Sequence, residues 1–379
     1  MSSICCPVNN YLEYADMEVT LEQTLVDSLV FKGSANNPFL APRGIWISSK
    51  RLFVADTGQN RVFVWNEIPQ DEYCEPDVVL GQSETDHTQR NAGDTANASS
   101  LQYPSGIWSD DKVLIVADAW NNRVLIWQEI PTRHGQPADI VLGQSDFDNN
   151  QPNANGIGSS PNSRTLNWPY GVHSDGEQLW VADTGNRRVL YYRQIPTTSN
   201  TAADKVIGQK DFNEREYDNQ NAIWPYSVRV NARGQMAITD TQYFRVLLWD
   251  DWKKSFEQQA NYIIGQSAFE NNGQNQFQLK PSSNSLNWCY DSFFQKDGIW
   301  VADTGNSRLL WFDQVPKENN LPAANLIGHD DFETGSENPN TVLGTESSLY
   351  WPFAVSINDK MMAIADTGNH RVILKAFDL

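Results

Sequence analysis

Six aspartates recur along this chain of 379 residues, and each is followed five positions later by an arginine. Carboxylates of this kind could perform acid–base catalysis. Six copies indicate instead a feature that every repeat needs. An aspartate that ends one strand and an arginine that begins the next face each other in a hairpin, so we interpret the pairs as structural, charge-assisted forks. The pairs are Asp56–Arg61, Asp118–Arg123, Asp183–Arg188, Asp240–Arg245, Asp303–Arg308 and Asp366–Arg371.

These pairs belong to a long repeat. Successive aspartates are separated by 62, 65, 57, 63 and 63 residues, and in five copies a glycine follows the aspartate by 25 positions. Each repeat contains four short runs of β-branched and aromatic residues between Gly, Asn, Asp and Pro, a pattern that predicts strands. In the first repeat these runs are 42–47, 52–56, 61–65 and 78–81.

Four-stranded units repeated radially predict an all-β fold, a six-bladed β-propeller of antiparallel blades. The chain ends at Leu379, twelve residues before the glycine of the sixth repeat would occur. Residues 22–33 resemble a fourth strand, so we expect an N-terminal strand to close the last blade and remove an exposed sheet edge. The prediction is one propeller domain over 22–379, preceded by an N-terminal tail over 1–21.

The segment Ala-Asp-Thr-Gly-Asn-His-Arg-Val at 365–372 resembles the signature of NHL repeats. The Gly-Gln-Ser-Asp-Phe element at 143–147 is similar to a bacterial subset of these proteins. The resemblance covers roughly residues 22–379 and implies a six-bladed NHL-type propeller. It leaves function open, because propellers of this kind include lyases, hydrolases, RNA binders and protein scaffolds.

Most of the 14 tryptophans lie in the predicted strands, where large rings are expected to fill the wedge between neighbouring blades. Four phenylalanines follow the fourth strand by a constant spacing and are expected to fill the wedge or anchor loops. They are Phe147, Phe212, Phe269 and Phe332.

Function is more readily found where the repeat breaks its own rules. Connections from the fourth-strand glycine to the next first strand span 23, 26, 17, 24 and 24 residues, and long loops of this kind are often functional. They lie on the face that we call the top, where the first strands begin beside the central channel. Two turns on this face depart from the motif, one with Trp120 at a glycine position and one with Tyr243 and Phe244 at positions expected to be polar and wet.

Aromatic residues also begin most first strands and should crowd the mouth of the channel. Two interpretations remain open, a plug that anchors the loops and an aromatic cup that binds a ligand or peptide. An acidic surround would favour a cationic partner in such a cup. The predicted ligand-binding residues are Tyr103, Trp120, Trp168, Tyr170, Trp224, Tyr226, Tyr243, Phe244, Trp288, Tyr290, Trp351 and Phe353.

Three polar residues of the channel are further candidates: His173, Arg229 and Asp291. The resemblance implies channel zinc on histidines for amidating-lyase-like propellers, but His173 alone of the five histidines maps to a first strand. A calcium or other divalent ion on Asp291, with Ser227 and His173, stays possible for a lactonase-like propeller. We predict no cofactor.

The formal net charge of −19 argues against nucleic acid as a partner, because such binding depends largely on Lys and Arg. No apolar run approaches the ~18 residues of a membrane span, and the chain begins without a secretory signal, so we expect a cytoplasmic protein. The favoured function is non-catalytic binding of a protein, peptide or small ligand on the top face. The alternative is a metal-assisted lyase or hydrolase in the channel. The oligomeric state stays open.

Overall fold

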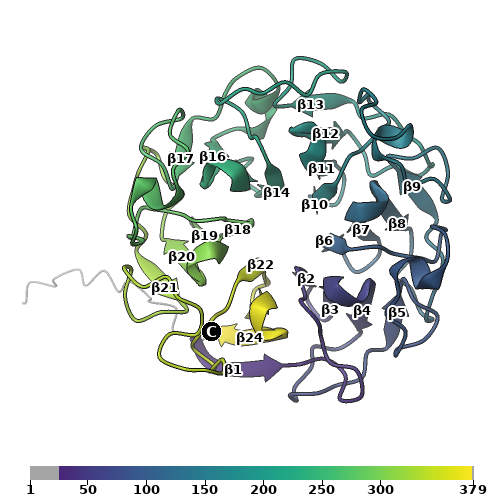
Figure 1. The fold of residues 1–379 in the computed structure, drawn as a ribbon, viewed down its shortest axis with the longest axis horizontal. Coiled ribbons are helices and arrows are strands. Elements are labelled where there is room, and N and C mark those ends of the chain that lie inside the picture. The colour runs from purple at the N-terminus through teal and green to yellow at the C-terminus, as the bar shows by residue number, and fades with distance from the viewer. Residues whose placement is uncertain (1–24, 378–379) are drawn as a thin grey trace, which may run out of the picture.

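The computed structural model describes residues 25–377, which form six four-stranded antiparallel sheets arranged radially around a central axis (Figure 1). The predicted six-bladed β-propeller is confirmed. The tail predicted over 1–21, with Cys5 and Cys6, lies outside the described residues. No helix within residues 25–377 is long and apolar enough to cross a membrane.

The strands occupy equivalent places in every blade, numbered here from the axis outward. The first strands are β2 (Gly44–Ile47), β6 (Pro104–Ser109), β10 (Pro169–Ser174), β14 (Pro225–Val230), β18 (Asp291–Gln295) and β22 (Pro352–Ile357). The second strands are β3 (Leu52–Asp56), β7 (Leu114–Asp118), β11 (Leu179–Asp183), β15 (Met236–Asp240), β19 (Gly298–Asp303) and β23 (Met361–Asp366). The third strands are β4 (Arg61–Trp65), β8 (Arg123–Trp127), β12 (Arg188–Tyr192), β16 (Arg245–Trp249), β20 (Arg308–Phe312) and β24 (Arg371–Phe377).

The fourth strands lie at the periphery and are short, apart from the one at the N-terminus. They are β5 (Val78–Leu80), β9 (Ile140–Leu142), β13 (Lys205–Ile207), β17 (Tyr262–Ile264), β21 (Asn325–Ile327) and β1 (Leu25–Phe31). The sequence placed the first strand of blade 1 two residues too early and included Gly81 in β5. Gly81 instead leaves the blade at φ +86°, a left-handed conformation that suits glycine, and bridges to Ser100 of the following connection.

The N-terminal strand β1 closes the ring as predicted. It pairs with β24 in antiparallel register, with Leu29 opposite Leu374 and Phe31 opposite Val372. Figure 1 shows the first and last strands of the described chain side by side in this blade. Blade 6 therefore combines residues from both ends of the sequence, and its outer edge is covered in the same way as in the other blades.

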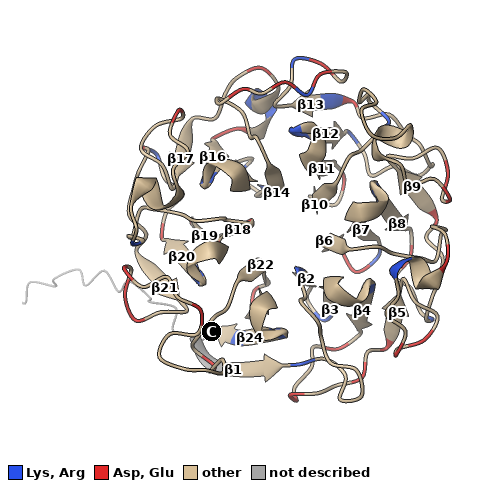
Figure 2. Ribbon diagram, in the orientation of Figure 1, with Lys and Arg blue, Asp and Glu red and all other residues tan. Residues whose placement is uncertain are grey.

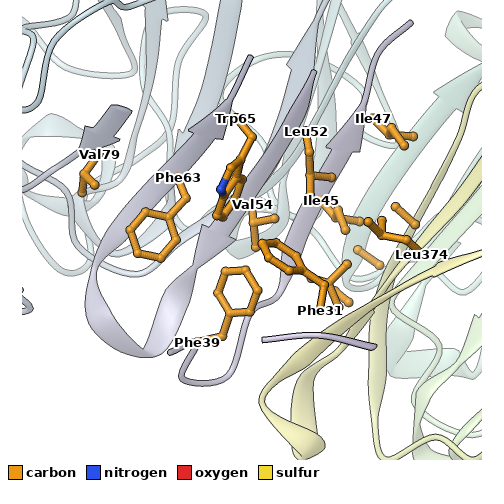
Figure 3. Close-up of a cluster of buried hydrophobic side chains, with 14 residues drawn as sticks. Phe31, Phe39, Ile45, Ile47, Leu52, Val54, Phe63, Trp65, Val79 and Leu374 are labelled. Atoms are coloured by element: carbon orange, nitrogen blue, oxygen red, sulfur yellow. The ribbon is translucent and has the colours of Figure 1, made fainter. Parts of the chain in front are cut away.

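The core consists of apolar layers between neighbouring sheets. Between blades 6 and 1, Phe31 packs edge-on against Phe39 and Trp65, with ring centroids 5.4 and 5.0 Å apart, and Leu374 contributes from β24 (Figure 3). The tryptophans Trp65, Trp127, Trp180, Trp249 and Trp300 are buried, as the wedge interpretation predicts.

Each second strand leads into the third through a single 3₁₀ turn, and each of these turns lies on the top face. The turns are η1 (Thr57–Gln59), η3 (Ala119–Asn121), η5 (Thr184–Asn186), η6 (Thr241–Tyr243), η9 (Thr304–Asn306) and η10 (Thr367–Asn369). Further 3₁₀ segments occur at η2 (Arg90–Gly93), η4 (Pro152–Ala154), η7 (Trp252–Phe256) and η8 (Gln274–Phe277). In Figure 2, charged residues gather mainly on the peripheral loops and the strands are mostly uncharged.

Candidate ligand-binding face

The repeated ion pair organises the loops of the top face. Asp183 and Arg188 lie opposite each other in the hairpin, and Arg188 Nε donates to Asp183 Oδ2 over 2.7 Å. The remaining guanidinium nitrogens donate to the backbone carbonyls of Phe212, Asn162 and Thr165. The prediction of a structural pair is therefore right, but the prediction of a bidentate contact is wrong. Nε alone of the Arg188 guanidinium donates to the carboxylate, because Nη1 and Nη2 donate to backbone carbonyls of neighbouring loops.

The aspartate also positions the start of the first strand in its own blade. Asp183 Oδ1 accepts the backbone N–H of Asn167 over 2.7 Å, directly before Trp168. Equivalent bonds join Asp118 to Gln102 and Asp303 to Asn287. Burial raises the pKa of the Asp56 carboxyl to about 6. The Arg61 guanidinium and the Leu40 N–H oppose this rise, because both stabilise the charged carboxylate.

Four aromatic residues at the entry to the first strands have a left-handed backbone. They are Tyr103, Trp168, Trp288 and Trp351, with φ between 47° and 56°. Bulky residues rarely adopt this conformation, which persists where surrounding bonds impose it. In two cases an asparagine from the turn of the preceding blade accepts the backbone N–H: Asn60 Oδ1 holds Tyr103 over 3.1 Å and Asn122 Oδ1 holds Trp168 over 2.9 Å. These rings are therefore placed by bonds from two blades.

The ring of residues just inside these aromatics closes the channel mouth. Tyr170 stacks on Tyr226 with centroids 4.7 Å apart, and Tyr290 stacks on Phe353 at 4.2 Å. Tyr226 also meets Tyr290 edge-on at 4.6 Å. In blade 1 the aromatic residue is replaced by Arg43, whose guanidinium lies 4.1 Å from the centroid of Phe353 and 5.1 Å from that of Tyr103. Burial raises the pKa of Tyr170 to about 12, consistent with a closed, poorly solvated cluster.

The same channel is filled again further from the top. Trp46 of blade 1 contacts Trp108 of blade 2 and Phe293 of blade 5, with centroids 6.2 and 6.0 Å apart. Because Trp46 and Phe293 come from non-adjacent blades, their rings meet across the axis. The plug interpretation therefore describes the inner residues of the predicted set, including Tyr226 and Phe353, which are both buried.

The polar channel candidates form a small buried cluster. Arg229 pairs with Asp291 over 2.9 Å, and Asp291 also accepts the backbone N–H groups of Ser292 and Val355. His173 Nε2 lies 2.9 Å from the carbonyl oxygen of Val230. Burial, together with the nearby Arg229, lowers the pKa of His173 to about 3.

These residues do not fit a divalent cation. The carboxylate of Asp291 already faces a guanidinium and two N–H donors, which compete with a metal for its oxygens. Within residues 25–377, no group of three or more His, Cys, Asp or Glu side chains is arranged to hold a metal ion.

The outer aromatics remain accessible. Trp120, Trp168 and Trp351 are each 43% exposed and Trp288 is 41% exposed, although they lie in a fold rich in buried tryptophan. Trp120 stacks on Tyr103 with centroids 4.3 Å apart, and Phe244 meets Trp288 edge-on at 5.3 Å. The predicted set thus includes a plug of rings at the channel mouth and a group of exposed tryptophans around it.

A pocket of about 390 Å³ lies between blades 3 and 4 on this face. Trp168, Trp224, Tyr217 and Tyr243 supply its aromatic lining. The Trp168 and Trp224 rings lie 6.2 Å apart at 46°, and Tyr217 meets Tyr243 at 6.1 Å and 68°. Arg187, Gln242 and Asn272 add polar groups to the lining.

One expectation about the turns is wrong. Tyr243 is buried rather than solvent-exposed, because the third position of these turns lies beneath the connections from the preceding blades. Its equivalents Asn121, Asn186 and Asn306 are buried as well. Trp120, at the second position of its turn, is exposed as expected.

Sequence reasoning missed Arg43 in the plug and Tyr217, Arg187, Gln242 and Asn272 in the pocket. A signal for the pocket was present, because the connection from Gly208 to Pro225 has 17 residues, whereas the four that enter blades 2, 3, 5 and 6 have 23 to 26. Arg43 carried no comparable signal, since an arginine beside a proline is ordinary and its ring partners come from other blades.

Comparison with known proteins supports the architecture. No model of a protein family matches the chain, and no curated protein matches it. Among solved structures, an auxiliary nutrient binding protein from Bacteroides thetaiotaomicron is similar over 93% of this chain and 76% of its own, with 11% identity and a TM-score of 0.54. Hydrazine synthase of Kuenenia stuttgartiensis is similar over 89% and 95%, with 10% identity and a TM-score of 0.51.

A streptogramin B lyase is also similar, over 93% of this chain and 98% of its own, with 9% identity and a TM-score of 0.47. At these identities the likeness concerns the fold alone. The chain is a six-bladed β-propeller. Its membership of the NHL-repeat family remains a resemblance in the repeat motif.

Proposed function

We propose that this protein is a non-catalytic, NHL-type binding propeller that takes a protein, peptide or small ligand on its top face. The observation that carries the proposal is the group of exposed tryptophans around the plugged channel. Two of them, Trp168 and Trp351, have a left-handed backbone whose N–H is held by the preceding blade. Rigid aromatic rings that are already in place lose little conformational entropy on binding, which favours their use as contacts.

Two further observations support binding over chemistry in the channel. Large apolar residues at the surface of a soluble fold commonly mark interaction sites when they gather on one face. The channel, by contrast, is filled by rings that meet across the axis, and its one buried carboxylate on β18, Asp291, is neutralised by Arg229. The metal-assisted alternative has no comparable support among residues 25–377.

The test is a screen of the purified protein against printed arrays of peptides and oligosaccharides. We expect at least one class of ligand to bind, and we expect the variant Trp168→Ala/Trp288→Ala to lose that signal at an unchanged melting temperature. Tyr73→Ala is the control, since Tyr73 is 41% exposed but lies between β4 and β5, on the opposite face. Equal binding by the double variant, or no binding on either array, would contradict the proposal.

A further inference from the structure

The pocket between blades 3 and 4 lies beside a connection that departs from a pattern shared by four of the six connections. Each of those four connections carries an asparagine ten residues after the fourth-strand glycine. This asparagine forms side-chain hydrogen bonds with an asparagine in the turn between the second and third strands of the following blade. The pairs are Asn91–Asn121, Asn153–Asn186, Asn275–Asn306 and Asn338–Asn369, with bonds from Nδ2 of the turn asparagine of 2.7–2.9 Å.

Blade 4 replaces this asparagine pair with two tyrosines. The connection from Gly208 to Pro225 has 17 residues, whereas those that carry the pair have 23 to 26. Tyr243 occupies the turn position, and Tyr217 of the shortened connection contacts it edge-on at 6.1 Å. The rings of Trp168 and Tyr217, which line the pocket, are accessible, at 43% and 57% exposure.

The shape of the pocket suits a small cyclic ligand. Its volume of about 390 Å³ falls within the ~300–1,000 Å³ of ordinary small-molecule sites. Trp168 and Trp224, inclined at 46°, form one aromatic wall, and Tyr217 lies on the facing connection. A ring-shaped molecule could therefore stack on one indole and touch a second aromatic ring.

The charges of the lining restrict the ligand further. No aspartate or glutamate lines the pocket, and its one ionised side chain is Arg187. A cation would be repelled by that guanidinium and would lack a carboxylate partner, in spite of the net charge of −19. The pocket thus selects against the cationic partner that the composition alone suggests.

The remaining polar groups match hydroxyls. Gln242 and Asn272 line the pocket, and their side-chain amides have no hydrogen-bond partner among the described residues. A side-chain amide can both donate and accept hydrogen bonds, as can a hydroxyl. Pyranose rings combine a face of C–H bonds, which packs on the negative face of an aromatic ring, with a rim of hydroxyls.

We propose that this pocket is a carbohydrate subsite that takes a neutral pyranose ring stacked on Trp168, with Gln242 and Asn272 at its hydroxyls. This inference rests on the proposed function, since it names the ligand class of one part of the same face. An aromatic hydrocarbon would use the rings but would give the amides no partner.

The experiment titrates the full chain with neutral hexasaccharides of glucose in β-1,4 and α-1,4 linkage, of xylose and of N-acetylglucosamine. Binding is followed by calorimetry and by tryptophan fluorescence. We expect one of these to bind and Trp168→Ala to weaken it about tenfold or more. Gln242→Ala should weaken it by about threefold or more, and this exposed turn residue can be replaced without disturbing the core. Tyr73→Ala should leave the affinity unchanged.

The outcomes separate the inference from the proposed function. Saccharide binding that neither Trp168→Ala nor Gln242→Ala weakens would overturn the inference, as would binding that Trp288→Ala weakens as much as Trp168→Ala does. Binding of peptides or planar aromatic compounds through Trp168, with none of a saccharide, would overturn the inference and leave the proposed function intact. Absence of all binding would overturn both.

Discussion

At the scale of residues, the aspartate that ends each second strand holds two structures at once. One oxygen of Asp183 accepts from Arg188 and from the amide of Asn186, and the other accepts the backbone N–H before Trp168. The guanidinium in turn holds three loop carbonyls. A buried ion pair of this kind is costly to break from one side, because the remaining charge is left without a partner.

Asp183→Ala should therefore lower the free energy of unfolding by about 3–5 kcal/mol. The loss follows from burying the Arg188 guanidinium without its carboxylate. Urea denaturation measures it, and Lys280→Ala is the control, since it removes an exposed ion pair with Glu333 and should cost less than about 0.5 kcal/mol. A loss below about 1 kcal/mol for Asp183→Ala would show that the pair does not carry the loops.

His173 should make stability fall as the solution is acidified. Its pKa is lowered to about 3 in the folded protein, from the ordinary value of 6.5, so between these values the unfolded chain binds a proton that the folded chain does not. Protonation then favours unfolding, and the contribution present above about pH 6.5 is lost progressively toward pH 3, by about 1.4 kcal/mol per pH unit.

The measurement compares urea denaturation of the parent with His173→Gln between pH 6 and pH 4. We expect the parent to lose more stability over this range than the variant, whose side chain does not titrate. Identical slopes would show that His173 titrates normally in the folded state. The comparison cancels the contributions of the carboxyl groups that both proteins share.

At the scale of elements, the top face depends on how the first strands begin. The tryptophans before β10, β18 and β22 have a left-handed backbone, and before β10 and β22 side chains from two blades accept the backbone N–H groups of this turn. In blade 4 the spacing from aspartate to proline is one residue longer, and Trp224 is not left-handed. Its indole forms one wall of the pocket together with that of Trp168.

The glycine and alanine variants should differ in stability in opposite directions at Trp351 and at Trp224. Trp351→Gly should be more stable than Trp351→Ala by about 1 kcal/mol, because a left-handed backbone strains every residue with a Cβ. At Trp224 the order should reverse, with glycine less stable than alanine by up to about 1 kcal/mol. Thermal melts of the four variants check this, and the same order at both sites would contradict the assignment of strain.

Closure of the ring depends on β1. Phe31 is fully buried against Phe39 and Trp65, and β1 covers the outer edge of β24. Phe31→Ala should cost about 3–5 kcal/mol in chemical denaturation and leave a single cooperative transition. Ser28→Ala on the same strand is the control and should cost less than about 0.5 kcal/mol. A biphasic transition would indicate that blade 6 unfolds apart from the others.

At the scale of the whole molecule, the propeller is a closed ring with a filled axis and one differentiated face. Stacked rings of Tyr170, Tyr226, Tyr290 and Phe353 close the channel at the top, and rings from blades 1 and 5 meet across it further down. Differences between blades then lie mainly in the top turns and connections. The connection before blade 4 is 6 to 9 residues shorter than the four that carry the asparagine pair, and the aromatic pocket lies beside it.

Restoring the common connection should close that pocket. We expect a chain in which residues 144–168 replace residues 209–224, together with Tyr243→Asn, to keep the propeller fold and lose saccharide binding by more than about tenfold. The graft supplies a connection asparagine that can pair with the asparagine introduced at position 243, and its longer connection should cover the pocket. Circular dichroism checks that the fold is kept, and calorimetry measures the loss of saccharide binding. Full affinity in a folded graft would place the binding site elsewhere.

The repeat was readable in the sequence because its signals are local. Proline and glycine at constant distances, the aspartate and arginine five residues apart, and the alternation of short apolar runs each reflect contacts within one blade. The closing strand was also predictable, since the missing length of the last blade matches a segment at the N-terminus. These features determined six blades, four strands in each, and a top face rich in aromatic residues.

The division of those aromatics was decided by tertiary structure. Tyr226 and Trp168 look alike in sequence, yet one is sealed among rings from three other blades and the other is open to solvent. Burial depends on which residues of distant blades converge at the axis, and no local pattern records that. For the same reason the place of Arg43 in the plug emerges only when the ring is closed, because its partners Tyr103 and Phe353 come from other blades.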